Sequence, residues 1–420
     1  MSRRLAALTA ALAVLGAPAR AWAVPAFARL YGTSCQTCHV AFPKNTPFGE
    51  AFRRNGYRFP GGRDEDFRKT EPQKLGADAY KDVFPNAVWP GELPSQVPLS
   101  IIFGAYAAAG PGADSGLSFA GLGGSATLNA ATTLGSRVSA WAGITILANT
   151  PAGVAVAAER LFVVFSAFQK PWLNLRVGRF EPGVFSFSGH RSLGPVSWIT
   201  TATVGDSPFA LEPSHFGLEA TGVVAGRIGW AAGLVEGAGG INLPKDGYLR
   251  ASYKLGGMRL DGEPSGGELD LSDPQPWREW SVHLGGFAYF GQTPLGVPGV
   301  ATQDDVFRVL GADLNAQLRD ANLILAYSFA RHRRPFLARP REGLDVHQVM
   351  AQLDYVVYPW LVPLARLELQ IARGVTQPRI VAGFYALVRA NVRTSLIAQV
   401  VQTNGRLEFD RLQAALSVGF

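Results

Sequence analysis

Residues 412–420 close the chain with the sequence LQAALSVGF, in which apolar side chains occupy positions 412, 414, 416, 418 and 420. Successive side chains of a β-strand point to opposite faces of the sheet, so this spacing puts all five on one face. The same period of two recurs at 310–318, 349–357 and 365–371. Because it governs the chain from Pro98 to the end, the pattern predicts a mainly β fold over residues 98–420.

The connections between these segments alternate between short and long. Tight turns are expected near 135–137, 170–172, 225–227, 319–321, 358–360 and 392–394. Longer loops are expected at about 110–116, 150–158, 183–214, 237–247, 291–304 and 331–344. This arrangement is typical of transmembrane barrels, whereas a soluble sandwich has no reason to adopt it. Counting from Leu99 gives about 16 strands, so we expect a transmembrane antiparallel β-barrel with both termini in the periplasm.

The end of the chain and its composition agree with an outer-membrane barrel. A final alternating strand that stops on an aromatic residue, here Phe420, resembles the signal by which such barrels are delivered for insertion. Hydrophobic residues make up 47% of the chain, yet no window after Ala23 reaches the roughly 18 consecutive apolar residues of a spanning helix. The basic excess is small and scattered, which argues against a nucleic-acid partner.

An export signal begins the chain. Arg3 and Arg4 precede a mostly apolar run at 5–16, and Ala21-Trp22-Ala23 matches the small-x-small rule for cleavage. The paired arginines raise the twin-arginine route as an alternative, but the residues that follow them continue that signal poorly. We therefore expect a signal peptide over residues 1–23 and export by the general secretory route.

The sequence Cys35-Gln36-Thr37-Cys38-His39 carries the only two cysteines of the chain. This spacing is that of a covalent c-type haem attachment site. The thiols of Cys35 and Cys38 would add to the vinyl groups of the haem, and His39 would be the proximal ligand of its iron. The alternative, a disulfide pair followed by a histidine, usually lies in a thioredoxin-like βαβ setting, which is not present here. The sequence therefore predicts one haem c.

Residues 24–59 are expected to form a small helical unit around this motif. Thr46 is placed to cap a helix that has Pro47 at its first position, and Asn55-Gly56 follows as its stop. A unit of this size cannot build a self-sufficient core, so the covalent haem would form part of that core. Residues 60–97 are charged and rich in proline, and we expect a linker there.

Taken together, these motifs resemble the fused monohaem cytochrome–porin family of bacterial outer membranes, whose best-known members are iron-oxidising cytochromes. The resemblance is carried by Phe27-Ala28-Arg29, the haem motif, Phe42-Pro43, Pro47-Phe48-Gly49 and the sequence FRRNGY at 52–57, followed by the linker and the barrel.

This resemblance implies an electron carrier in the lipid of the outer membrane, with its haem in the barrel lumen or at the periplasmic end. Electrons would pass between an extracellular donor or acceptor and a periplasmic carrier such as a soluble cytochrome or a cupredoxin. Fe(II) is one such donor, in which case the protein would be an Fe(II) oxidase. Two other functions stay open: a solute porin with a structural or regulatory haem, and a five-coordinate haem enzyme or sensor.

The second axial ligand of the iron has to come from outside the helical unit, because no other histidine or methionine occurs between Ala23 and Val97. Strand phase directs His283 and Met350 into the lumen, while His190 lies in the long third loop, which folds inward in porins. We rank His190 first, His283 second and Met350 third. The alternatives are a five-coordinate iron or a weak ligand such as Lys44 or water.

Basic residues surround the haem motif and are candidates to pair with the two haem propionates. They are Arg29, Lys44, Arg53, Arg54 and Arg58. The alternative is that they are solvated side chains on the surface of a small helical unit.

Overall fold

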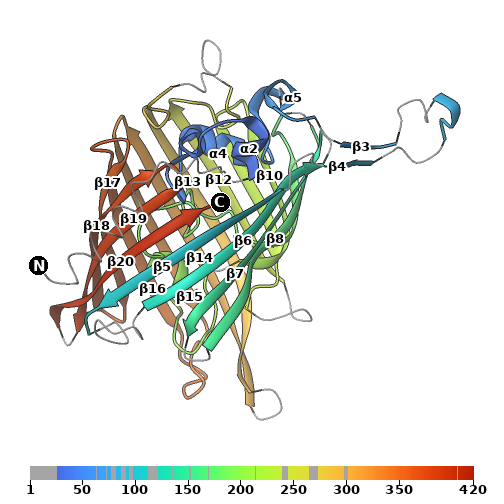
Figure 1. Ribbon diagram of the computed structural model, residues 1–420. Coiled ribbons are helices and arrows are strands. Elements are labelled where there is room, and N and C mark those ends of the chain that lie inside the picture. The colour runs from blue at the N-terminus through green and yellow to red at the C-terminus, as the bar shows by residue number, and fades with distance from the viewer. Residues whose placement is uncertain are drawn as a thin grey trace, which may run out of the picture.

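Sixteen antiparallel strands close into a barrel in the computed structural model of the protein (Figure 1). The structure describes residues 26–420 except 63, 72, 77–81, 87–90, 94–97, 112–121, 135, 151–152, 169, 213, 239–244, 264–272, 298–300 and 404. The predicted signal peptide, 1–23, therefore lies outside the described residues. The prediction of about 16 strands in a mainly β fold is confirmed.

Each strand of the barrel pairs with its neighbours in sequence. The strands are β5 (Leu99–Ala109), β6 (Leu122–Leu134), β7 (Val138–Thr150), β8 (Gly153–Ser166), β9 (Asn174–Phe180), β10 (His215–Val224), β11 (Ile228–Val235), β12 (Asp246–Gly256), β13 (Trp280–Val297), β14 (Ala301–Leu318), β15 (Ala321–His332), β16 (Leu344–Tyr355), β17 (Leu361–Ala372), β18 (Val375–Arg389), β19 (Val392–Thr403) and β20 (Arg406–Gly419).

The alternating segment at the end of the chain forms the seam that closes the barrel. It belongs to β20, which pairs with β5 from Leu412 opposite Ala109 to Gly419 opposite Ile102. The backbone N–H of Phe420 donates to the carbonyl of Ile101 at 2.8 Å. A closed sheet has no free edge, so every strand finds partners on both sides.

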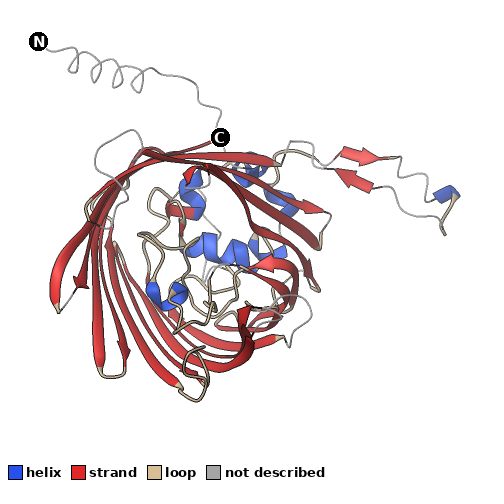
Figure 2. Cartoon of the chain, turned by 90° about the horizontal axis from the view of Figure 1, so that it is seen from below, coloured by secondary structure: helices blue, strands red, loops and turns tan. Residues whose placement is uncertain are grey.

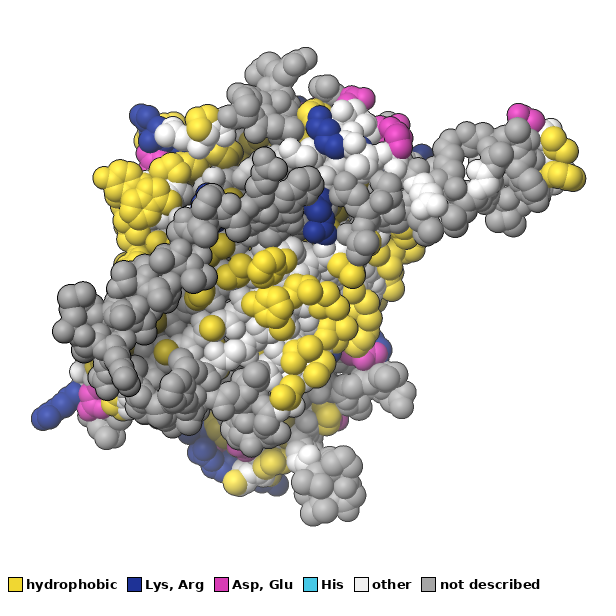
Figure 3. Space-filling view, viewed as in Figure 1, with side chains coloured by type: hydrophobic (Ala, Val, Ile, Leu, Met, Phe, Trp, Pro, Cys, Tyr) yellow, Lys and Arg dark blue, Asp and Glu magenta, His cyan; other side chains and the backbone are white. Residues whose placement is uncertain are grey.

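The two faces of the barrel differ as the period of two requires. In β15, Asn322 and Ser328 are buried toward the lumen, while Leu325 and Tyr327 are 39% and 43% exposed on the outside. Exposed apolar side chains lie on the outer faces of the strands, and Figure 3 shows an apolar band of this kind across one side of the barrel. Such a band is the surface that a transmembrane barrel presents to lipid. No helix in the described part of the chain is long and apolar enough to cross a membrane.

Most predicted turns are confirmed, but the strict alternation of short and long connections is not. The turn expected at 392–394 falls at 390–391. The long loops expected at 150–158 and 291–304 are wrong, because β7 and β13 continue there as hairpins with the strands that follow them. On the side of the short turns, residues 257–279 make a long connection that the sequence did not indicate.

A small helical unit lies inside the mouth of the barrel at the end where the chain terminates (Figure 2). Its elements are α2 (Ala26–Tyr31), α3 (Cys35–Cys38), β1 (His39–Ala41), β2 (Lys44–Asn45) and α4 (Pro47–Arg54). The predicted caps of α4 are confirmed: the Thr46 hydroxyl accepts from the Gly49 N–H at 3.1 Å, Pro47 begins the helix, and Asn55 ends it.

The helical packing continues past residue 59 into the segment expected to be a linker. That segment holds η1 (Pro60–Gly62), α5 (Asp64–Phe67), β3 (Gln73–Leu75) and β4 (Gly91–Leu93). The Tyr31 hydroxyl donates to Asp64 at 2.6 Å, and the rings of Phe59 and Phe67 stack at 4.4 Å. Beyond α5, β3 and β4 pair as a short arm that points away from the barrel (Figure 2).

The long connection between β9 and β10, at 181–214, folds into the lumen as predicted (Figure 2). It contains the single turn α7 (Trp198–Thr201), which is held against β16 and β17. Arg366 donates to the carbonyl of Leu193 at 2.7 Å, and Glu368 accepts from the Trp198 N–H at 3.0 Å. The lumen is therefore occupied from one end by the helical unit and further in by this loop.

Candidate functional site

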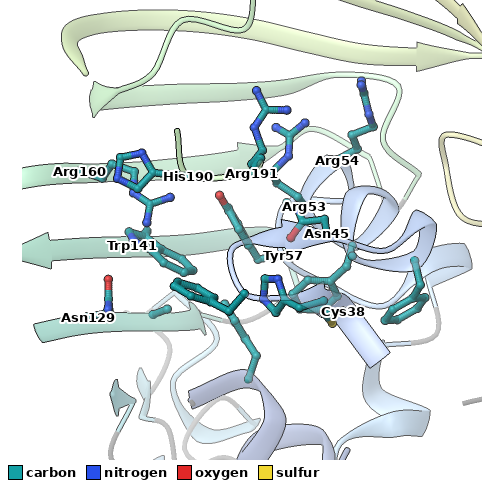
Figure 4. Close-up of a pocket in the computed structure, with 18 of the residues that line it drawn as sticks. Cys38, Asn45, Arg53, Arg54, Tyr57, Asn129, Trp141, Arg160, His190 and Arg191 are labelled. Carbon is teal, nitrogen blue, oxygen red and sulfur yellow. The ribbon is translucent and has the colours of Figure 1, made fainter. Parts of the chain in front are cut away.

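A cavity lies between the helical unit and the inner wall of the barrel, and it combines side chains from three parts of the chain (Figure 4). The volume open to the centre of a water molecule is about 290 Å³. Cys35, Cys38 and His39 line it from the helical unit, His190 from the 181–214 loop, and Arg160 from β8. The motif at residues 35–39, predicted to attach haem, thus faces the lumen.

The haem motif folds as a single helical turn. Ser34 caps this turn by accepting from the Gln36 N–H at 3.2 Å. Cys35 and Cys38 are free thiols, and burial together with the nearby Cys35 raises the pKa of Cys38 to about 12. A β-carbon on Gly49 would stand 2.1 Å from the Cys38 carbonyl oxygen, so glycine is required for α4 to lie this close to the motif.

His39 presents a neutral imidazole. Burial lowers its pKa to about 4, although backbone hydrogen bonds near Lys44 and Pro43 act in the opposite direction. Its Nδ1 atom is buried and has no hydrogen-bond partner among the described residues. A neutral imidazole with an unsatisfied nitrogen is the form of histidine that binds a metal ion.

Aromatic rings from the helical unit and from the barrel wall enclose the cavity. Phe27 stacks on Tyr57 with ring centroids 5.8 Å apart, and Tyr57 approaches Trp141 of β7 at 5.3 Å. Phe52 meets Phe27 edge-on at 5.2 Å. These walls are suited to a large planar apolar group.

Guanidinium groups line the other side of the cavity. Figure 4 shows Arg53, Arg54 and Arg191 with their charged ends pointing the same way. Arg53 is paired with Glu50 at 2.9 Å, whereas the Nε of Arg54 is buried without a partner in the described structure. Burial and the neighbouring charge of Arg53 lower the pKa of Arg54 to about 9. An anionic group of a ligand would relieve this excess of positive charge.

The three candidates for the second axial ligand lie in different places. His190 lines the cavity, but its Nδ1 contacts Glu181 and its Nε2 lies 3.2 Å from Glu159. Burial alone would lower the pKa of His190, but the hydrogen bonds with the two carboxylates outweigh it and raise the pKa to about 9. His283 and Met350 face the lumen but are not among the lining residues, and Met350 packs against Ser197 of the loop.

The basic residues near the motif also lie in different places: some line the cavity and others bond to the barrel wall. Arg53 and Arg54 line the cavity, whereas Lys44 points to the wall, where it bonds to Asp354 at 2.5 Å and to Asn322 at 2.8 Å. Lys44 is therefore not placed as a weak iron ligand or as a propionate partner. Arg29 donates to the carbonyl of Leu99 and Arg58 to the Ser166 hydroxyl.

Sequence reasoning missed two arginines and a tryptophan of the cavity. Arg160 lies over the ring of Trp141, with 5.0 Å between its guanidinium carbon and the ring centroid, and Arg191 donates to the carbonyl of Ser186 at 3.1 Å. Strand phase is the signal that could have identified Arg160 and Trp141, because both belong to the lumen-facing set of their strands. Within the described ranges, no group of three or more His, Cys, Asp or Glu residues is placed to hold a metal ion.

Hydrogen bonds around the rim fix the helical unit to the barrel. They join Gln36 to the carbonyl of Pro359, Lys44 to Asp354, Arg393 to the carbonyl of Phe42, Ser139 to that of Gly56, Asn174 to that of Arg54, and Asn55 to that of Asp261. Because these partners are spread around the circumference, the unit is held as a plug of the mouth.

No protein-family model matches the chain, and no curated protein matches it. Among solved structures, an anion-selective porin from Comamonas acidovorans is 13% identical, with a TM-score of 0.51 over 77% of this chain and 98% of the porin. The corresponding values are 12%, 0.48, 77% and 93% for OprB of Pseudomonas putida, and 10%, 0.49, 79% and 98% for Salmonella typhi OmpF in complex with daunomycin. The likeness to the first establishes a porin-like barrel fold.

Proposed function

We propose that this protein holds one haem c in the mouth of an outer-membrane barrel and passes single electrons across that membrane. The observation that carries the proposal is the position of the haem motif: two free thiols and a neutral buried imidazole face a cavity of the lumen. The residues present fit the group, because the cavity joins aromatic walls to guanidinium groups with unsatisfied polar atoms.

Each part of the site has a role in this proposal. Cys35 and Cys38 attach the haem, and His39 is the proximal ligand of its iron. Phe27 and Tyr57 exclude water from the site, and Arg54 pairs with a carboxylate of the bound group. A haem c, when bound, supplies a couple that takes up and releases one electron.

The proposed second ligand is His190, because it lines the cavity and the other two candidates do not. To bind the iron, one ring nitrogen of His190 has to give up its contact with Glu181 or Glu159. The partners proposed are a donor or acceptor outside the cell, Fe(II) among the donors, and a periplasmic carrier such as a soluble cytochrome or a cupredoxin.

A solute porin is the second candidate, and the likeness of the barrel to an anion-selective porin favours it. A diffusion channel needs a continuous water-filled lumen. The helical unit in the mouth and the 181–214 loop behind it occupy part of the lumen. This obstruction opposes the diffusion of solutes, but it does not oppose the transfer of electrons.

The experiment uses the whole protein in liposomes that enclose a soluble cytochrome and a small anionic dye. An impermeant external reductant should reduce the enclosed cytochrome through the wild-type protein, while the Cys35→Ala/Cys38→Ala variant should not support reduction. The dye should stay inside in both cases. Equal reduction rates in both forms, or dye release without reduction by either form, would favour the porin function instead.

A further inference from the structure

A row of four residues crosses the outer surface of the barrel near the end opposite the helical unit. Phe290 of β13, Arg308 of β14, Arg331 of β15 and Asp345 of β16 are successive cross-strand partners. All four side chains are exposed, and the residues on either side of the two arginines along their strands are buried toward the lumen. The row therefore faces outward, away from the cavity described above.

The row lies at the edge of the apolar band. Nearer the middle of the barrel, the same strands expose Leu310, two residues from Arg308, and Tyr327, four residues from Arg331, at 43% each. The guanidinium of Arg331 lies over the ring of Phe329, 5.5 Å from its centroid. Aromatic side chains collect where hydrocarbon gives way to lipid head groups, so the two arginines stand at head-group level.

The charges of this surface are only partly balanced by the chain. Arg331 is paired with Asp345 at 2.8 and 2.6 Å, but the side chain of Arg308 has no hydrogen bond or ion pair with any residue that the structure describes. Two like charges directly opposite each other on neighbouring strands oppose pairing of those strands. The adjoining loop adds exposed Arg333 and Arg334, and basic side chains are visible along the lower rim in Figure 3.

From this row we infer that the outer face of β14 and β15 binds a phosphate group of an acidic lipid in the surrounding leaflet. Guanidinium groups bind phosphate oxygens in pairs of parallel hydrogen bonds, and Arg308 offers such a group. Arg331 beside it adds positive charge and its Nη1, because its Nε and Nη2 donate to Asp345. The ligand is carried by a lipid because the site faces the bilayer, and the exposed Phe290 and Leu310 offer apolar contact to its acyl chains. This inference does not depend on the haem.

The test uses the full-length protein in a nonionic detergent and three probes: lipopolysaccharide with a bisphosphorylated lipid anchor, the same lipid with its phosphates removed, and inorganic phosphate. Arg308→Glu/Arg331→Glu should weaken binding of the phosphorylated lipid by about tenfold or more, which is the effect of losing charged hydrogen bonds. Arg406→Glu, at the start of β20 and exposed at the same end of the barrel, is the matched control and should bind as wild type.

Circular dichroism and heat-dependent gel mobility establish that each variant forms the barrel. If the double variant does not fold, the single Arg308→Gln change replaces it, with a weaker loss of the same binding expected. Equal affinity of wild type and variants, or equal affinity for the lipid without phosphates, would overturn the inference. Inorganic phosphate bound as tightly as the lipid would also overturn it, because the site would then not select a lipid.

Discussion

Two regions of the lumen differ in how completely their buried polar groups are hydrogen-bonded. Where the 181–214 loop rests on β16 to β18, polar groups are paired: Glu368 accepts from the Ser197 hydroxyl, the Trp198 N–H and Arg379. Arg366 donates to Gln352 at 2.6 Å and to the carbonyl of Leu193. This network joins loop and wall without any group from outside the chain.

In the cavity beside the helical unit, by contrast, several buried polar atoms have no hydrogen-bond partner among the described residues. Among the residues lining it, six have a buried polar atom that no other described residue satisfies: His39, Arg54, Trp141, Arg160, Asn174 and Arg176. Leaving such a group unpaired costs about 1–3 kcal/mol each. The contact of the loop with β16 to β18 is made by the chain itself, and the unsatisfied atoms of the cavity support the proposal that it receives the haem.

The largest expected effect comes from removing the thiols of the cavity. Cys38→Ala should abolish covalent haem staining on denaturing gels and lower the yield of mature protein, because the cavity then loses the attachment of its packing partner. Gln36→Ala, within the same helical turn, is the control and should stain normally. Normal staining of the Cys38→Ala protein would show that haem is attached without this thiol, and the cavity would then no longer be identified as the haem site.

A second prediction concerns the attachment of the helical unit to the wall. Lys44 and Asp354 form an ion pair whose side chains are 10% and 2% exposed. Lys44→Met should weaken docking of the unit by about 3 kcal/mol, because the carboxylate is left buried without its partner. Limited proteolysis of the folded barrel should then release the unit much faster.

The control for this variant is Lys170→Met, which breaks the more exposed pair with Glu263. Exposed pairs contribute little, so proteolysis should stay near the wild-type rate. If Lys44→Met is as resistant as the control, the other hydrogen bonds around the rim hold the unit, and the ion pair serves only to neutralise charge.

The third prediction tests whether the paired region is a structural contact. Glu368→Gln keeps the shape of the side chain but removes the charge that Arg379 contacts, and it should destabilise the loop by about 1–2 kcal/mol. Single-channel recordings should show a larger or more fluctuating conductance than wild type, with haem staining unchanged. A loss of haem staining would show instead that loop and cavity are not separable.

The sequence predicted the features that depend on local spacing. The period of two located the barrel and its last strand, which ends at Phe420, the cysteine spacing located the candidate attachment site, and Thr46 with Pro47 located the start of α4. These features could be predicted because each is decided by residues within a few positions of one another.

Features that depend on barrel closure could not be predicted in this way. Arg160 and Arg191 reach the cavity because β8 and the inward loop meet there, and Lys44 turns from the cavity because Asp354 of a distant strand stands opposite. The segment 291–297 carries glycine and proline, which are uncommon inside strands, and yet it extends β13. There β13 pairs only with β14, so the hairpin projects past its other neighbours.

The smallest effect is a pH dependence of the 181–214 loop. Burial, and then the negative charge of Glu181, raise the pKa of Glu212 to about 7, although the Gly189 N–H donates to it at 3.0 Å. A carboxyl whose pKa is raised by folding contributes stability that is complete below its usual pKa near 4.5 and is lost as the pH rises through about 7.

Hydrogen exchange of the loop amides, corrected for the intrinsic rate, should therefore indicate less protection at pH 8 than at pH 5, by about threefold to tenfold. Glu212→Gln should make protection equal at the two values, because the amide does not titrate. The charge of His190, whose pKa is about 9, would change the loop only at higher pH, so the two groups can be told apart. If Glu212→Gln retains the full difference between pH 5 and pH 8, then a group other than Glu212 limits the stability of the loop.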